Sequence, residues 1–238
     1  MAAVPRARRW LTAQPYAHRG LHGAGVPENS LAAFERAAAA GHGIECDIRC
    51  AADGTPYVFH DDRLERLTGV AGRFGDKTSE EIADLRLSDG SSVPTLVAML
   101  ELVAGRVPIL LEVKSGWISP LALCRAIADQ LAHYAGPAAV MSFDARVPQW
   151  FARARRRIAR GLVLSRRDHP PGAASRRHGL AIARARPHFL ACDVRDLSNQ
   201  LAIEARRRGL PILCWTVRTH AQMQRARRYA DQPIFERR

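Results

Sequence analysis

The segment Ile44-Glu45-Cys46-Asp47-Ile48-Arg49 is the stretch around which the rest of the chain is organised. In an extended strand alternate side chains share a face, so Glu45, Asp47 and Arg49 lie together, opposite the apolar residues. Two carboxylates on one face repel each other, and a site that keeps both ionised normally supplies a metal ion or an arginine. An edge strand with one solvated face would explain the same alternation, and the surrounding chain decides between the two interpretations.

The composition is that of a large globular domain. The chain has 238 residues, 47% of them hydrophobic, and no run of 18 or more apolar residues. This length suits a single α/β barrel, and no membrane-spanning helix is expected. Residues 1–15 contain three arginines without a following apolar segment, which argues against a secretory signal. We therefore expect one domain over residues 1–238 and a cytoplasmic location.

Cysteine usage and charge exclude several other classes. The five cysteines include no CxxC pair, and buried thiols in a reducing compartment explain them better than disulfides or a zinc site. The formal net charge is +13, but arginine and alanine are enriched throughout, and the basic clusters lie on helix-like segments without interleaved aromatics. Solvated helix faces are the favoured interpretation, with a weak attraction to anionic substrates or membrane surfaces as an alternative. No obligate nucleic-acid partner is expected.

A regular alternation of strands and helices indicates the fold. Helix-like segments separate eight strand-like ones, at 15–18, 44–49, 107–113, 138–142, 160–164, 188–193, 211–217 and 233–235. This is the α/β pattern of a (β/α)8 TIM barrel. A doubly wound open sheet is disfavoured because no GxGxxG or Walker loop follows a strand. The pattern stops at the eighth strand, so no final helix is expected.

The segment after the second strand breaks the alternation. Residues 57–60 form another extended run, which should pair with strand 44–49 as a hairpin. Residues 61–92 contain several glycines and one short helical stretch. We interpret residues 61–92 as a small insertion over one end of the barrel.

Polar side chains collect at the carboxyl ends of the strands, where the active sites of such barrels lie. They are His18 and Arg19 at the end of the first strand, Glu45 and Asp47 near the end of the second, His60 at the end of its hairpin partner, Glu112 and Lys114 at the end of the third, and Trp215 and Arg218 at the end of the seventh. Packing alone does not explain so many ionisable groups at strand ends. This convergence favours a functional site over a solvated edge.

The carboxylates and cations predict a site for a metal ion and a phosphate. Glu45, Asp47 and Glu112 form an oxygen-rich set that suits a hard divalent cation, Mg²⁺ or Ca²⁺. Arg19 and Lys114 would neutralise an anion beside that cation, and phosphate fits a guanidinium paired with an ammonium.

Two histidines complete the predicted site. His18 and His60 titrate near neutrality and suit acid and base roles on either side of a phosphorus atom. Together with a divalent cation and cationic phosphate ligands, they predict cleavage of a phosphodiester.

Seven short motifs run in order along nearly the whole chain. They are Ala17-His18-Arg19-Gly20, Pro27-Glu28-Asn29-Ser30, Glu45-Cys46-Asp47, His60-Asp61, Leu111-Glu112-Val113-Lys114, Ser142-Phe143-Asp144 and Trp215-Thr216-Val217. In this set and order the chain resembles the glycerophosphodiester phosphodiesterase family. The resemblance implies a TIM barrel with an insertion after strand two. It also implies a hydrolase of lipid and glycerol metabolism that converts glycerophosphodiesters, such as glycerophosphocholine, to sn-glycerol 3-phosphate and an alcohol.

The same resemblance implies roles for individual residues. His18 and His60 would be the acid/base pair, and Arg19 and Lys114 would contact the phosphate. The three carboxylates named above would bind the metal ion. A neighbouring glycerol hydroxyl, activated by the metal, would attack first, and water would then open the resulting cyclic phosphate.

Some features stay open at this stage. Phe74 in the insertion and Trp215 are expected to line the substrate pocket, but the alcohol head group is not fixed. Arg218 stands where the family often has asparagine, and Asp193 either faces the site or is a plain strand-end carboxylate. The choice between Mg²⁺ and Ca²⁺ and the oligomeric state are also open.

Two other functions compete with the phosphodiesterase hypothesis. A lysophospholipase D-type enzyme would use the same site on lysophospholipids at a membrane surface. A basic nucleic-acid-binding barrel would explain the charge but leave the carboxylates and histidines without a role.

Overall fold

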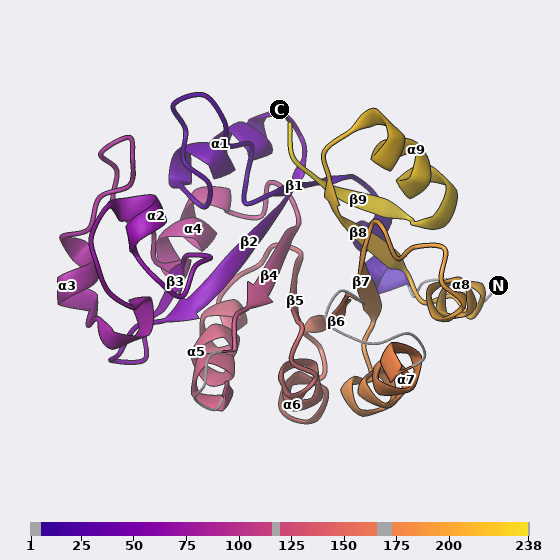
Figure 1. The fold of residues 1–238 in the computed structure, drawn as a ribbon. Helices are drawn as coiled ribbons and strands as arrows, with labels where there is room; N and C mark the ends of the chain where they lie inside the picture. Colours follow the sequence, from indigo (N-terminus) through magenta and orange to yellow (C-terminus); the bar gives the residue numbers. More distant parts are fainter. Residues whose placement is uncertain (1–5, 116–119, 166–172, 238) are drawn as a thin grey trace. The chain divides into compact units, whose positions relative to one another are not determined.

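The structure, a computed structural model of the chain, describes residues 6–115, 120–165 and 173–237 (Figure 1). Its strands and helices alternate in the order expected from the sequence. The chain divides into two compact units, one built mainly of residues 17–138 and the other of residues 139–236 with the segment up to Tyr16. Strand β1, Tyr16–His18, spans the boundary between these two units in the sequence.

The unit of residues 17–138 is built on the long strand β2 (Figure 1). Its elements are β2 Gly43–Cys50, β3 Pro56–Val58, β4 Ile109–Val113, α1 Leu31–Ala39, α2 Glu65–Thr68, η2 Phe74–Asp76, α3 Ser79–Ala83, α4 Leu96–Val103 and α5 Leu121–Ala132. Strand β2 pairs antiparallel with β3, which confirms the predicted hairpin, and parallel with β4. The parallel register sets Asp47 opposite Glu112, so two carboxylates occupy neighbouring positions of the sheet.

Helix α1 begins where an alanine-rich segment follows a good cap. The Ser30 hydroxyl accepts a hydrogen bond from the Ala33 amide at 3.1 Å, which satisfies a donor that the first turn leaves unpaired. The turn after β1 passes close to this helix. Gly20 has a φ of +80°, and a Cβ there would lie 2.7 Å from the Ala33 carbonyl carbon. Glycine is therefore required at this turn by both its backbone conformation and its close approach to α1.

The segment 61–92 contains the short helices α2, η2 and α3, which pack around a cluster of buried apolar side chains. Thr78 and Glu81 form a capping box that starts α3. The Phe74 ring is 0% exposed and stacks on Phe59, with ring centroids 4.8 Å apart. The expectation that Phe74 lines the substrate pocket is therefore wrong, because its side chain packs the core of this segment.

The unit of residues 139–236 is a parallel sheet with helices. Its elements are η1 Arg6–Thr12, β5 Ala138–Ser142, α6 Arg146–Ala154, β6 Ala159–Leu164, α7 Ala173–Ala185, β7 Phe189–Asp193, α8 Gln200–Arg207, β8 Ile212–Val217, α9 His220–Tyr229 and β9 Gln232–Phe235. Consecutive strands from β5 to β9 pair in parallel, and Figure 1 shows α6 and α7 below these strands and α9 above β9. Parallel strands covered by helices are buried, which explains their nearly continuous apolar runs.

The cysteines lie mostly in the interior of the protein. All five cysteines are free thiols, and the prediction of buried thiols is confirmed for four of them, whereas Cys50 is partly buried. Burial is the main cause that raises the pKa of Cys192 and of Cys214 to about 12, so both stay protonated at neutral pH.

Within the described ranges, no helix combines the length and apolar character needed to cross a membrane.

Candidate active site

The carboxylate face of β2 forms the floor of the site. Glu45 and Asp47 are both buried on this strand, and Glu112 is buried on the neighbouring strand β4. One oxygen of each carboxylate lies within 4.8 Å of an oxygen of the other two. The parallel pairing of β2 and β4 therefore brings together the three side chains that the sequence predicts as metal ligands.

Two cations face these carboxylates. The Lys114 ammonium lies 2.9 Å from Asp47 Oδ1 and 2.5 Å from Glu112 Oε1. The Nε of Arg19 lies 3.0 Å from Asp47 Oδ2. Burial alone would raise the pKa of Asp47, but the charges of Lys114 and Arg19 outweigh burial and hold that pKa below its usual range. Both side chains predicted to bind phosphate thus lie beside an ionised Asp47.

The carboxylate of Glu45 has fewer hydrogen bonds and positive charges around it than that of Asp47. Its Oε2 accepts a hydrogen bond from the Arg19 backbone N–H at 3.1 Å, whereas Oε1 is buried and lacks a hydrogen-bond partner among the described residues. Burial, followed by the charges of Asp47 and Glu112, raises the pKa of Glu45 well above its usual range. A buried oxygen without a partner costs free energy, and a cation beside it would remove that cost. The three carboxylates therefore fit a hard divalent cation.

Asn29 orients Asp47 and was not predicted as a site residue. Its Nδ2 donates to Asp47 Oδ2 at 2.9 Å, and its Oδ1 accepts from the Asp47 amide at 3.4 Å. Asn29 has a φ of +57°, a left-handed conformation that asparagine tolerates better than most residues. In the sequence Asn29 stands out only as part of the motif Pro27-Glu28-Asn29-Ser30, whose last residue, Ser30, caps α1.

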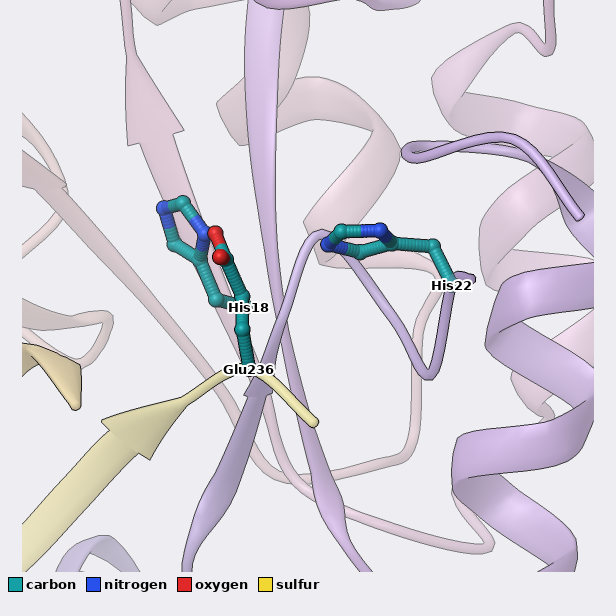
Figure 2. A group of neighbouring side chains, drawn as sticks. All are labelled: His18, His22 and Glu236. Atoms are coloured by element: carbon teal, nitrogen blue, oxygen red, sulfur yellow. The ribbon is translucent and has the colours of Figure 1, made fainter. Parts of the chain in front are cut away.

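His18 stands at the end of β1, and His22 lies on the loop that follows (Figure 2). His18 is largely buried, and its Nε2 lies 3.9 Å from Glu45 Oε2. Glu236, drawn in the same figure, belongs to the other unit, where it accepts hydrogen bonds from Arg218 at 2.5 and 2.8 Å. Arg218, which stands where the family often has asparagine, thus forms an ion pair with Glu236.

His60 follows β3 and is held from two sides. Its Nδ1 lies 2.6 Å from Asp61 Oδ1, and its backbone carbonyl accepts a hydrogen bond from Arg49 Nε at 2.8 Å. Burial lowers the pKa of His60 below its usual range, although the charge of Asp47 acts in the opposite direction. Arg49, the third polar residue of the β2 face, thus supports the backbone of a predicted catalytic residue.

A group of charged side chains adjoins His60 and Arg19, and the sequence alone did not indicate it. Arg66 on α2 donates hydrogen bonds to both Asp61 and Glu28. Glu28 also accepts a hydrogen bond from Arg19 Nη1 at 2.7 Å. All these side chains lie in the unit of residues 17–138.

The remaining predicted side chains lie in the other unit. Trp215 on β8 donates its Nε1–H to the Ala191 carbonyl at 3.1 Å, and its ring packs edge-to-face on Phe143. Asp193 at the end of β7 is buried and accepts hydrogen bonds from the Arg195 side chain and backbone. A pocket role for Trp215 stays a prediction.

The sequence model of the Glycerophosphoryl diester phosphodiesterase family matches residues 18–236. The chain belongs to this family. A glycerophosphodiester phosphodiesterase from Caldanaerobacter subterraneus subsp. tengcongensis is 38% identical over 109 residues, covering 42% of this chain and 44% of that relative. A glycerophosphodiester phosphodiesterase from Bacillus altitudinis is 36% identical over 110 residues, covering 42% of this chain and 43% of that relative. The matches therefore span less than half the length of these curated relatives.

Solved structures establish the fold of this family member. An Oleispira antarctica phosphodiesterase, solved in complex with the product sn-glycerol-3-phosphate, has a TM-score of 0.82 at 23% identity, covering 94% of this chain and 92% of that chain. The glycerophosphodiester phosphodiesterase from Thermotoga maritima has a TM-score of 0.76 at 24% identity, covering 93% of this chain and 94% of that chain. The likeness confirms the (β/α)8 barrel predicted from the sequence.

Proposed function

We propose that the protein hydrolyses glycerophosphodiesters to sn-glycerol 3-phosphate and an alcohol, with a divalent cation bound by Glu45, Asp47 and Glu112. The buried cluster of these carboxylates, with Arg19 and Lys114 beside it, is the observation that supports this proposal most strongly. The family match over residues 18–236 and the product named for the Oleispira antarctica phosphodiesterase agree with it.

The donor set favours Mg²⁺ or Ca²⁺ over softer metals. All three proposed ligands are carboxylates, and hard cations prefer oxygen. The buried Glu45 Oε1, which lacks a hydrogen-bond partner in the described part of the chain, supplies an oxygen that is not already engaged. When bound, the cation would withdraw charge from the phosphate oxygens and make a neighbouring hydroxyl more acidic.

Arg19 and Lys114 would hold the phosphate. In the structure, both lie within 3.0 Å of Asp47 oxygens, so their positive charges already point at the carboxylate cluster. A phosphate beside that cluster would bring oxygens to the same two side chains. The guanidinium would contribute paired donors and the ammonium a compact charge.

His18 and His60 would move the protons. One imidazole accepts the proton of the attacking glycerol hydroxyl as the new P–O bond forms, and the other protonates the alcohol oxygen as its P–O bond breaks. In the second step, water loses a proton to the histidine that had acted as the acid. The glycerol oxygen then regains a proton from the other histidine as the cyclic phosphate opens.

A direct assay tests the proposal. Purified protein with Mg²⁺ or Ca²⁺ is incubated with glycerophosphocholine, glycerophosphoethanolamine, glycerophosphoglycerol and glycerophosphoinositol, and released sn-glycerol 3-phosphate is measured with a coupled dehydrogenase. We expect release that stops with EDTA and in His18→Ala and His60→Ala, and that persists in His133→Ala, an exposed histidine next to α5. Absence of sn-glycerol 3-phosphate with every diester and both metals would refute the proposed function.

A further inference from the structure

The segment between β3 and α4 contributes an arginine that reaches two parts of the site. Arg66, on α2, donates through Nε and Nη2 to the two oxygens of Asp61, at 2.5 and 3.0 Å. Through Nη1 and Nη2 it donates to the two oxygens of Glu28, at 3.0 and 2.7 Å. One guanidinium thus joins two carboxylates that come from different loops.

Each of these carboxylates holds a residue of the proposed chemistry. Asp61 Oδ1 lies 2.6 Å from His60 Nδ1, and Glu28 Oε1 lies 2.7 Å from Arg19 Nη1. We propose that Arg66 is a positioning residue that fixes, through Asp61 and Glu28, the orientation of both His60 and Arg19. This inference rests on the proposed function, because it assigns Arg66 a task in that reaction.

The contact with Asp61 determines which nitrogen of His60 can exchange a proton with substrate. Burial would raise the pKa of Asp61, but hydrogen bonds from Arg66 and His60 outweigh it and lower that pKa to about 2. Asp61 is therefore ionised at neutral pH and only accepts hydrogen bonds. The Nδ1 of His60 must then be the donor, so Nε2 is left to take and give the reacting proton.

The contact with Glu28 fixes the other side of the site. Arg19 lies between Glu28, which accepts from its Nη1, and Asp47, whose Oδ2 is 3.0 Å from its Nε. The hydrogen bond to Glu28 fixes one edge of the guanidinium, and the charge of Asp47 attracts its Nε side, although Nε makes no hydrogen bond among the described residues. A fixed plane is what paired contacts to a phosphate require. Arg66 holds Glu28 in place and thereby limits how far the Arg19 guanidinium can turn.

Arginine is the side chain that this geometry requires. Arg66 uses three nitrogens in a fixed plane to make four hydrogen bonds to two carboxylates. A lysine ammonium at the same position is a single point charge and cannot span both partners in fixed directions. The side chain of Arg66 is 49% exposed, so solvent screens its ion pairs with Glu28 and Asp61, which are themselves 14% and 22% exposed, and limits their contribution to folding stability. Loss of Arg66 should therefore lower activity much more than stability.

Kinetic analysis of substitutions at position 66 tests the inference. Arg66→Gln and Arg66→Lys are compared with Arg63→Gln, which removes a side chain that is 65% exposed and is paired with Glu65. We expect kcat on glycerophosphocholine to fall by roughly 10- to 100-fold in Arg66→Gln, the scale on which misplaced catalytic groups act. KM should rise as well, Arg66→Lys should recover only part of the loss, and Arg63→Gln should match wild type. Melting temperatures should stay close to that of wild type.

A double-mutant cycle separates the two contacts of Arg66. If Arg66 acts on His60 through Asp61, then adding Arg66→Gln to Asp61→Asn should lower kcat little further. Adding Arg66→Gln to Glu28→Gln should likewise raise KM little further. Fully additive effects in both backgrounds, or wild-type kinetics in Arg66→Gln, would overturn the inference.

A spectroscopic readout keeps this test independent of the proposed activity. In protein with ¹⁵N-labelled histidine and without substrate, NMR of the His60 ring should show the proton on Nδ1. In Arg66→Gln the ring should shift toward a mixture of tautomers, and Arg63→Gln should not change it. A wild-type protein without activity would refute the proposed function alone. An unchanged tautomer in Arg66→Gln would refute the positioning role whether or not the protein is active.

Discussion

Replacement of Asn29 should reveal how the site is held in shape. Its Nδ2 donates to the buried, ionised Asp47 at 2.9 Å, and a hydrogen bond to a charged group contributes about 1.5–3 kcal/mol. Its φ of +57° adds a second effect, because most L-residues lose about 1–2 kcal/mol in the left-handed conformation. Asn29→Ala suffers both losses, so we expect a destabilisation of about 2.5–5 kcal/mol.

The comparison with Asn29→Gly makes this prediction specific. Glycine also loses the contact with Asp47, but it accepts the positive φ without strain. At an ordinary helical position the order is the reverse, and alanine is the more stable variant by about 1 kcal/mol. Glu101, exposed on α4, provides that control. We therefore expect Asn29→Gly to be at least as stable as Asn29→Ala, and Glu101→Ala to be more stable than Glu101→Gly.

Thermal unfolding measured by circular dichroism is a suitable assay. In a chain of this size a loss of 1 kcal/mol corresponds to about 2–4 °C, so Asn29→Ala should melt roughly 5–20 °C below wild type. The reasoning would be refuted by an alanine variant that melts with wild type. It would also be refuted if alanine were clearly more stable than glycine at position 29, as it is at position 101.

Three further predictions concern the metal site, the acid stability and the core of the segment 61–92. Glu45→Gln should weaken Mg²⁺ or Ca²⁺ binding by at least about tenfold in calorimetric titration, whereas Glu101→Gln should leave it unchanged. Burial lowers the pKa of His188 to about 4, so the folded protein resists protonation of this residue. Wild type should therefore lose stability as pH falls from about 6.5 to 4. Over this pH range the melting temperature of His188→Gln should fall less than that of wild type. Phe74→Ala removes a fully buried ring and should lower the free energy of unfolding of the segment 61–92 by about 3–5 kcal/mol. Faster proteolysis within residues 61–92 would reveal that cost, and wild-type protection would contradict it.

The sequence predicted the parts of this molecule that follow from periodicity. Alternation along β2 put Glu45 and Asp47 on one face, and the β/α repeat set β4 beside β2. Because both strands run in the same direction, Glu112 meets Asp47 across the sheet. The proposed metal ligands could therefore be found without any knowledge of the loops.

The site residues that the sequence did not predict lie in irregular segments, where neither helical nor strand periodicity sets the direction of a side chain. Asn29 reaches Asp47 only because its backbone takes a left-handed turn, and Arg66 reaches Asp61 only because α2 folds back from an irregular segment. The interpretation of Phe74 failed for a related reason. An aromatic residue among glycines can line a pocket or fill a core, and its packing on Phe59 depends on contacts that local sequence does not encode.

The left-handed conformations of Arg19 and Asn29 explain the residue types of the two motifs that contain them. Arg19, with a φ of +57°, holds its backbone N–H toward Glu45, and its carbonyl accepts from the Asn29 amide at 3.0 Å. Such a conformation costs an arginine about 1–2 kcal/mol, and charge-assisted hydrogen bonds of about 1.5–3 kcal/mol can offset that cost. Gly20 completes the turn because any larger side chain would collide with α1. The carboxylates of β2 thus hold the strained loop, and the loop in turn orients the carboxylates. The loop of residues 19–29 and strand β2 therefore stabilise each other, and together they keep negative charges close together where the proposed cation would bind.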